Sequence, residues 1–232
     1  MKKIVKFVQG QIPNTNIFAV KYPVGMVYLY KISNDYIMFD AGTDKSHSIF
    51  DNDYKHKIFV EALKELGIDV NDVKWIFLTH SDLDHVDGLT LFPCAKVYIS
   101  EYELPLINGK AKRDKYNGNN MPEGIDINKL ILLSDRQELS YNNNTKIKCI
   151  MAPGHTIGSM LYLVDGKYLF TGDAIMIKNG NIDVHPYTMD RKLSRKTIEK
   201  LKDIFNSSLI ILTSHYGVYD NGHLGKGENN GF

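Results

Sequence analysis

The chain has 232 residues and a mass of 26.4 kDa, which is the size of one large domain or two small ones. Hydrophobic residues make up 43% and charged residues 24%, a balance that excludes a collagen-like, coiled-coil or wholly disordered chain. The formal net charge is +1, so no overall field favours nucleic acid or an anionic membrane as a partner.

The N-terminal segment carries lysines but no continuous apolar stretch, so it does not resemble a signal peptide. No apolar run approaches the roughly 20 residues of a membrane span. We therefore expect a cytoplasmic protein, and we expect Cys94 and Cys149 to be buried as small hydrophobic residues.

Apolar runs and turn residues in the first half predict an edge strand, a hairpin, one amphipathic helix and a buried strand. These elements cover residues 1–10, 27–32 with 36–39, about 54–66, and 74–79.

The second half predicts a short strand, a long aperiodic segment, a strand, a hairpin, a helix and a last strand. They cover residues 95–99, 107–124, 146–151, 160–164 with 168–170, about 192–205, and 209–212. Residues from about 217 onward are rich in glycine and asparagine and are expected to form a flexible tail.

Strands followed by a helix occur twice in this order, and no linker or internal repeat divides the chain. This order predicts an α/β fold in which two sheets pack face to face with helices outside. We expect one domain over residues 1–232.

The segment from Thr79 to Gly88 contains two histidines and three carboxylates directly after a buried strand. A buried cluster of this kind needs charge partners or a metal, and imidazole and carboxylate are ligands for zinc, iron and manganese. Further ligand-type residues follow three other apolar runs, each at a turn of small residues. These are His155, Asp173 and His215.

The pattern resembles the metallo-β-lactamase superfamily, whose signature is His-x-His-x-Asp-His, then a distant His, an Asp and a last His. The matching residues in this chain are His80, Asp82, Asp84, His85, His155, Asp173 and His215. The resemblance covers about residues 24–217 and implies a four-layer αββα sandwich. An early acidic position of the family is matched by Asp40, at the end of the run 36–39.

The resemblance also implies a ligand set for two divalent metal ions. His80, Asp82 and His155 would hold one ion; Asp84, His85 and His215 would hold the other, with Asp173 bridging. Asp40 would accept a hydrogen bond from a ligand imidazole and fix its orientation.

One position departs from the family signature, because Asp82 stands where the second histidine is usual. Zinc is the family's usual metal, but a carboxylate here suits iron or manganese better than imidazole does. With three carboxylates and a bridging hydroxide, the charge of two divalent ions would be fully balanced.

The implied activity is metal-dependent hydrolysis of a small-molecule substrate, an ester, thioester or lactone, with a bridging hydroxide as the nucleophile. Asp84 would orient that hydroxide, and the phenol of Tyr216 would line the pocket and support an oxyanion. Two alternatives stay open: a di-iron redox protein related to the flavodiiron core, and a metal-bearing binding or sensing domain. The oligomeric state is also open, with a homo-oligomer among the alternatives.

Other polar residues are expected to be structural or solvent-exposed. We expect His185 to lie in a surface turn, and His47, His56 and His223 to face solvent. The basic stretch from Arg191 to Lys202 is interrupted by acidic residues and is expected to be a solvated helix face. The turn at residues 22–26 is expected near the rim of the site.

Overall fold

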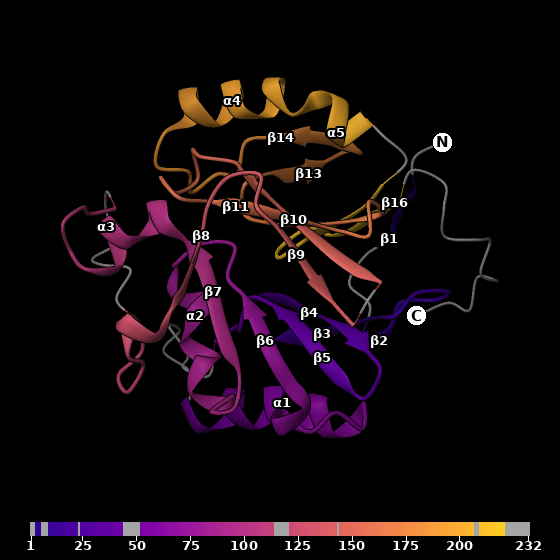
Figure 1. The fold of residues 1–232 in the computed structure, drawn as a ribbon. Coiled ribbons are helices and arrows are strands. Elements are labelled where there is room, and N and C mark those ends of the chain that lie inside the picture. The colour runs from indigo at the N-terminus through magenta and orange to yellow at the C-terminus, as the bar shows by residue number, and fades with distance from the viewer. Residues whose placement is uncertain are drawn as a thin grey trace.

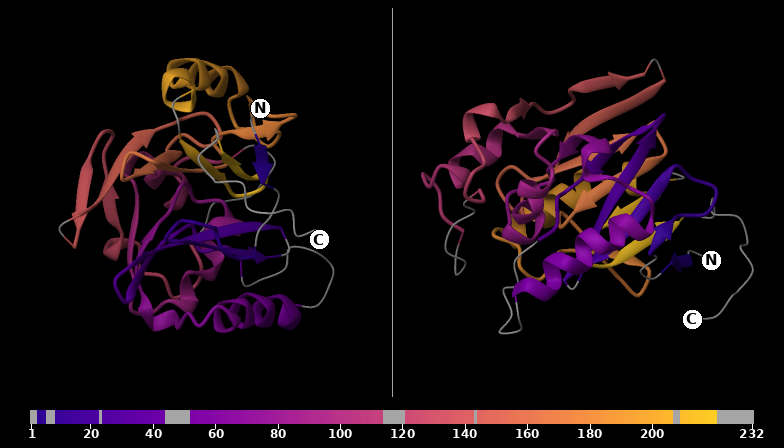
Figure 2. Two further views of the ribbon diagram at one scale, coloured as in Figure 1. Left: turned by 90° about the vertical axis from the view of Figure 1, so that its right-hand side faces the viewer. Right: turned by 90° about the horizontal axis from the view of Figure 1, so that it is seen from below.

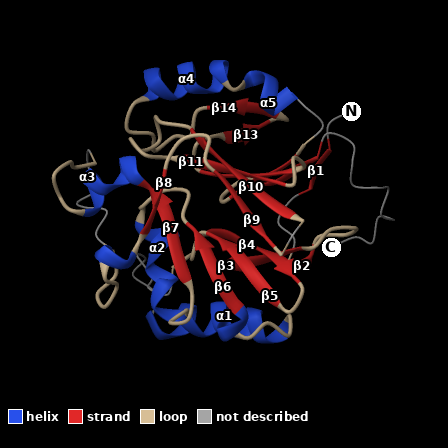
Figure 3. Cartoon of the chain, viewed as in Figure 1, coloured by secondary structure: helices blue, strands red, loops and turns tan. Residues whose placement is uncertain are grey.

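The structure is a computed structural model, and it describes residues 3–5, 9–22, 24–43, 52–113, 121–142, 144–206 and 209–220. Helices lie on two opposite outer faces and strands lie between them (Figure 1, Figure 3). Among the described helices, none is long and apolar enough to cross a membrane.

The first seven-stranded sheet has the order β2-β3-β4-β5-β6-β7-β8. Its strands are β2 (Gly10–Gln11), β3 (Ile17–Tyr22), β4 (Gly25–Ile32), β5 (Asp35–Phe39), β6 (Val73–Phe77), β7 (Lys96–Ser100) and β8 (Ile131–Leu133). The pair β4–β5 is the predicted hairpin, whereas β5 to β8 pair in parallel. Parallel pairing brings the carboxyl ends of β5 and β6 to the same edge of the sheet.

The second seven-stranded sheet has the order β1-β16-β15-β12-β11-β10-β9. Its strands are β1 (Lys3–Val5), β9 (Glu138–Tyr141), β10 (Thr145–Met151), β11 (Met160–Val164), β12 (Tyr168–Gly172), β15 (Ile210–Thr213) and β16 (Gly217–Asp220). β1 is the expected edge strand, and β12 and β15 run in parallel. A separate hairpin joins β13 (Met176–Lys178) and β14 (Asn181–Asp183).

Helix α1 (Asn52–Glu65) covers the outer face of the first sheet, and α4 (Arg191–Lys200) and α5 (Lys202–Asn206) lie at the opposite side of the molecule, beyond the second sheet (Figure 1, Figure 2). Two short helices, α2 (Leu83–Val86) and α3 (Leu104–Ile107), follow β6 and β7. The predicted αββα sandwich is therefore confirmed.

Successive side chains of a strand point to opposite faces of its sheet, so each strand contributes to two layers of the core. In β4, Tyr28 and Tyr30 enter the core between the sheets, whereas Val27 and Leu29 enter the core under α1. A third cluster joins the second sheet to α4 and α5. Both sheets are thus buried on both faces, which explains their nearly continuous apolar runs.

The structure corrects three expectations. The helix expected over 192–205 is divided at Leu201, which leaves the α-helical region (φ −97°, ψ 6°). The tail expected from 217 begins later, because Gly217–Asp220 forms β16 between β15 and β1. Cys149 is buried as predicted, but Cys94 is exposed.

The exposed basic residues of α4 and α5 confirm the predicted solvated helix face. His47, His223 and the side chain of His56 lie outside the described residues, as do residues 221–232.

Candidate metal centre

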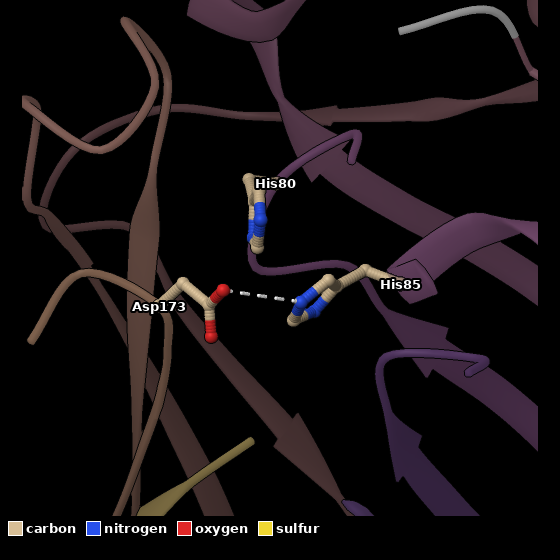
Figure 4. Close-up of side chains that lie close together, drawn as sticks. All are labelled: His80, His85 and Asp173. Carbon is tan, nitrogen blue, oxygen red and sulfur yellow. Dashed lines mark ion pairs between the residues drawn. The ribbon is translucent and has the colours of Figure 1, made fainter. Parts of the chain in front are cut away.

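The ligand-type residues predicted from the sequence lie together where strands of both sheets end. His80 follows β6, Asp84 and His85 lie on α2, and Asp173 follows β12 directly. Figure 4 shows His80, His85 and Asp173 pointing toward one another from three different segments.

The predicted ligands form two groups of three side chains. Within each group, the ligand atoms all lie within 4.8 Å of one another. One group is His80, Asp82 and His155; the other is Asp84, His85 and His215. These are the two sets that the family signature implies.

Asp173 lies between the two groups. Its Oδ2 is 3.2 Å from His215 Nε2, 3.6 Å from His85 Nε2 and 3.7 Å from His155 Nε2. Gly172, just before it, has φ +50°, and an added Cβ would lie 2.1 Å from Thr79 Oγ1. Glycine at this position therefore lets the end of β12 approach the end of β6.

Three imidazoles have Nδ1 engaged, which directs Nε2 into the cluster. His85 Nδ1 lies 2.8 Å from Asp40 Oδ2, His215 Nδ1 lies 2.7 Å from the Val24 carbonyl, and His80 Nδ1 lies 3.0 Å from Thr79 Oγ1. Since a carboxylate or carbonyl can only accept, Nδ1 of His85 and His215 donates, and Nε2 carries the lone pair that a metal needs once the imidazole is neutral.

Asp40 contacts both His85 and the residue that follows the end of β6 by two positions, Thr79. Its Oδ1 accepts from the backbone N–H of Thr79 at 2.7 Å, and its own backbone is left-handed at φ +61°. A non-glycine residue in this region stores strain, which is characteristic of a functional site.

Several buried polar atoms of the cluster have no hydrogen-bond partner among the described residues. They are Nε2 of His80 and His85, Oδ1 of Asp82 and Asp173, and Nδ1 of His155 and His185. Unpaired buried polar atoms are costly, so this set of nitrogen and oxygen donors fits a divalent metal such as zinc.

Charge differs between the two groups in the metal-free chain. Burial acts to lower the pKa of His215, but Asp173 and hydrogen bonds to Asp173 and Asp84 raise it to about 10. Burial is likewise outweighed at His85, where Asp40, Asp84 and Asp173 raise the pKa well above its ordinary value. In the other group, burial and the neighbouring His85 lower the pKa of His80 to about 4.

His185 was expected in a surface turn, and that prediction is wrong. It is 3% exposed, its Nε2 lies 3.6 Å from Asp173 Oδ2, and with His155 and Asp173 it forms a further group of possible ligands. Val184 and His185 are buried, whereas Pro186 and Tyr187, which follow them, are exposed. Burial lowers the pKa of His185 to about 4.

Sequence reasoning did not single out Arg113 or Glu103. Arg113 pairs with Asp82, although it lies in the segment expected to be an aperiodic loop. Glu103 is fully buried and accepts hydrogen bonds from Ser81 and Gly158. The position of Glu103 just after a strand end is the signal that could have found it.

Tyr22 and Tyr216 lie at the edge of the site. Tyr22 donates to the Asp84 carbonyl at 2.9 Å, which places the end of β3 beside the cluster. Tyr216 is half-buried, and its ring centroid lies 5.6 Å from that of His185.

The sandwich and its histidine- and aspartate-rich strand ends define a class of metal-binding α/β proteins. A family model described as the metallo-beta-lactamase superfamily matches residues 23–212. The chain belongs to this superfamily.

Curated relatives include the probable polyketide biosynthesis zinc-dependent hydrolase PksB of Bacillus subtilis, 31% identical over 72% of this chain and 66% of the relative. A probable metallo-hydrolase of Methanocaldococcus jannaschii is 24% identical over 69% of this chain and 66% of the relative. A hydroxyacylglutathione hydrolase of Brucella anthropi is 33% identical over 49% of this chain and 36% of the relative. The chain thus spans at most 66% of the length of these relatives.

Solved structures share the fold. A metallo-beta-lactamase family protein of Thermus thermophilus gives a TM-score of 0.62 at 19% identity, covering 88% of this chain and 75% of that one. An archaeal superfamily protein of Sulfolobus tokodaii gives 0.59 at 22% identity, covering 90% of this chain and 82% of that one.

Proposed function

We propose that the chain is a metal-dependent hydrolase of a small ester, thioester or lactone. The observation that carries the proposal is the cluster of seven ligand-type side chains, in which several buried ligand atoms lack a partner among the described residues. The hydrolase names of the relatives support the same reaction class.

In this proposal His80, Asp82 and His155 hold one ion, and Asp84, His85 and His215 hold the other, with Asp173 between them. A bound zinc ion would lower the pKa of water toward about 7 and polarise the carbonyl oxygen of the substrate. Asp40 keeps His85 in the tautomer that presents Nε2.

The chain's own residues would handle the protons. Asp84 presents a carboxylate oxygen 3.2 Å from His215 Nε2, where it would orient the attacking water. Burial raises the pKa of Tyr216, so its phenol stays protonated and is a hydrogen-bond donor for the oxyanion.

Exposed apolar side chains next to the ligands favour an acyl substrate. Val24 is 49% exposed beside His215, Ile157 is 37% exposed two residues after His155, and Tyr187 is 61% exposed in the segment that carries His185. Exposed apolar side chains in these segments suit the apolar part of an acyl group better than a polyanion.

The test is an assay of zinc-reconstituted protein against a panel of acyl thioesters, aryl esters, lactones, a β-lactam and a phosphodiester. We expect hydrolysis within the first three classes, loss of it on chelation, and recovery with zinc. Turnover that survives removal of all metal, or none on any acyl substrate by a zinc-loaded chain, would contradict the proposal.

Metal analysis of protein as isolated separates this proposal from the redox alternative. Zinc is the expected metal. Iron together with an iron-oxo absorbance band, and no hydrolysis, would favour the di-iron reading that Asp82 leaves open.

A further inference from the structure

Arg113 enters the metal centre from a segment far from the signature motif. It is 7% exposed, its Nη1 forms an ion pair with Asp82 Oδ2, and its Nη2 lies 3.2 Å from His155 Nε2. The same Nη2 donates to the carbonyl oxygen of Tyr187. The guanidinium is therefore held from three sides.

The two atoms that Arg113 contacts in the cluster are ligand atoms. Asp82 Oδ2 is also the oxygen that faces the rest of the group, 3.4 Å from His80 Nε2 and 3.2 Å from His155 Nε2. A nitrogen lone pair that accepts a hydrogen bond from a guanidinium is not available to a metal ion. The guanidinium thus occupies Asp82 Oδ2 and the lone pair of His155 Nε2, whereas Asp82 Oδ1 and His155 Nδ1 have no partner among the described residues.

We propose that Arg113 and a metal ion compete for Asp82 and His155, so that the chain binds one ion tightly and a second one only by displacing Arg113. The tight ion would lie at Asp84, His85 and His215. This inference rests on the proposed function, because it concerns the affinity of the two metal positions.

The second group has no such competitor among the described residues. The ion-pair partners of Asp84 there are His85 and His215, both of which are ligands themselves. An imidazole offers a lone pair once it is neutral, whereas a guanidinium stays charged and has no acceptor atom. An ion held by Asp82 Oδ2 and His155 Nε2 therefore requires Arg113 to move away.

The carboxylate at position 82 gives Arg113 an anionic partner inside the cluster. A carboxylate in a buried cluster needs a cation, and Arg113 supplies one without a metal. With a histidine at position 82 the guanidinium would lose its ion pair with Asp82. Asp82 and Arg113 thus act as a pair.

The test is a zinc titration of metal-free protein against a competing chelator, with Arg113→Gln and the control Arg136→Gln. Arg136 is suitable because its side chain is 80% exposed and pairs with Asp135. We expect two affinities in the wild type and in the control. Outer partners change metal affinity by about 10- to 100-fold, so we expect the weaker affinity in Arg113→Gln to rise by about that factor.

A second readout follows the wild-type arginine itself. The chain has only four arginines, so 15N-arginine labelling resolves their side chains by NMR. We expect the signal of Arg113 to stay in place through the first equivalent of zinc and to shift during the second. This readout decides the matter even if Arg113→Gln does not fold.

Two equally tight zinc ions in the wild type, or an Arg113 signal that is unmoved when both ions are bound, would overturn the inference and leave the hydrolase proposal intact. Zinc at neither group would contradict the proposed function itself.

Discussion

Asp84 has two proposed roles, as a ligand and as the group that orients the attacking water. Its carboxylate lies 3.2 Å from His215 Nε2 and 3.7 Å from His85 Nε2. His85 lies on α2 with Asp84, whereas His215 follows β15, so the contact with His215 joins the α2 segment to the end of β15. Because the side chain of Asp84 is 28% exposed, loss of its charge should affect the site far more than the fold.

For Asp84→Asn we expect a loss of at least about 10²-fold in kcat/KM, because misplacing the attacking water by about 1 Å costs that much, with an unchanged circular dichroism spectrum. Asp203→Asn is the matched control, because Asp203 is exposed on α5. Near-wild-type turnover by Asp84→Asn would show that the role is misassigned.

The raised pKa of His215 makes the stability of the metal-free chain depend on pH. Its folded pKa is about 10 against 6.5 for an ordinary histidine, so the charged form stabilises the fold. This contribution is fully present below about pH 6.5 and is lost as pH rises through about 10.

The measurement is urea unfolding of chelator-treated wild type and His215→Gln between pH 6.5 and pH 10. We expect the wild type to lose more free energy of unfolding than the variant as pH rises, because other groups cancel in the difference. Parallel pH profiles for the two proteins would refute the role of His215.

Residues near the signature motif could be predicted from the sequence, whereas Arg113 and His185 could not. The motif residues are recognisable because they follow apolar strands at fixed spacing. Arg113 lies in a segment rich in glycine, asparagine and lysine, and only tertiary structure brings it to Asp82. His185 precedes a proline, which favours a turn, but the turn is folded inward over Asp173.

Glu103 connects the two loops that carry His80 and His155. It accepts from Ser81 N at 3.0 Å and from Ser81 Oγ at 2.9 Å, and from Thr156 Oγ1 at 3.0 Å and Gly158 N at 2.9 Å. Glu103 is the last residue of the 3-10 helix that follows β7. The segment after β7 therefore fixes the spacing between the loop of His80 and the loop of His155.

Glu103→Gln should lower the free energy of unfolding by about 1–3 kcal/mol, because an amide NH₂ would face donors that need an acceptor. Glu103→Gln should also weaken zinc binding. A destabilising substitution away from the loops of His80 and His155 would not do so. Glu101→Gln is the control, since Glu101 is exposed in the same turn and accepts from Ser134 Oγ. Equal stability of the two variants would contradict this role.

Strand and helix positions follow from apolar periodicity, and most are predictable. The last predicted helix is an exception, because the structure divides it at Leu201. The backbone leaves the helical region there, and both Leu201 and Phe205 are buried in the cluster between the second sheet and the helices. The segment Gly217–Asp220 was missed because glycine suggests a loop, although Val218 and Tyr219 are buried.

The metal centre depends on the packing of the two sheets, because its residues come from both. Phe39 of the first sheet stacks on Phe170 of the second, with ring centroids 3.7 Å apart. Tyr28 donates to the carbonyl of Thr213, two residues before His215. The inter-sheet core therefore sets the distance between the two halves of the ligand set.

Phe170→Ala should cost about 3–5 kcal/mol of stability, as expected for removal of a buried aromatic ring. Leu132→Ala, at a position that is 43% exposed, is the control and should cost little. Urea unfolding measures both; a cost for Phe170→Ala below that of the control would contradict the packing argument.

The most direct test of the metal centre is anomalous X-ray scattering from crystals of the zinc-loaded protein, recorded on both sides of the zinc edge. We predict a strong anomalous peak bounded by Asp84, His85, Asp173 and His215, and a weaker or absent peak at His80, Asp82 and His155 while Arg113 stays on Asp82. A zinc peak away from both groups, or no peak in this cluster, would contradict the account.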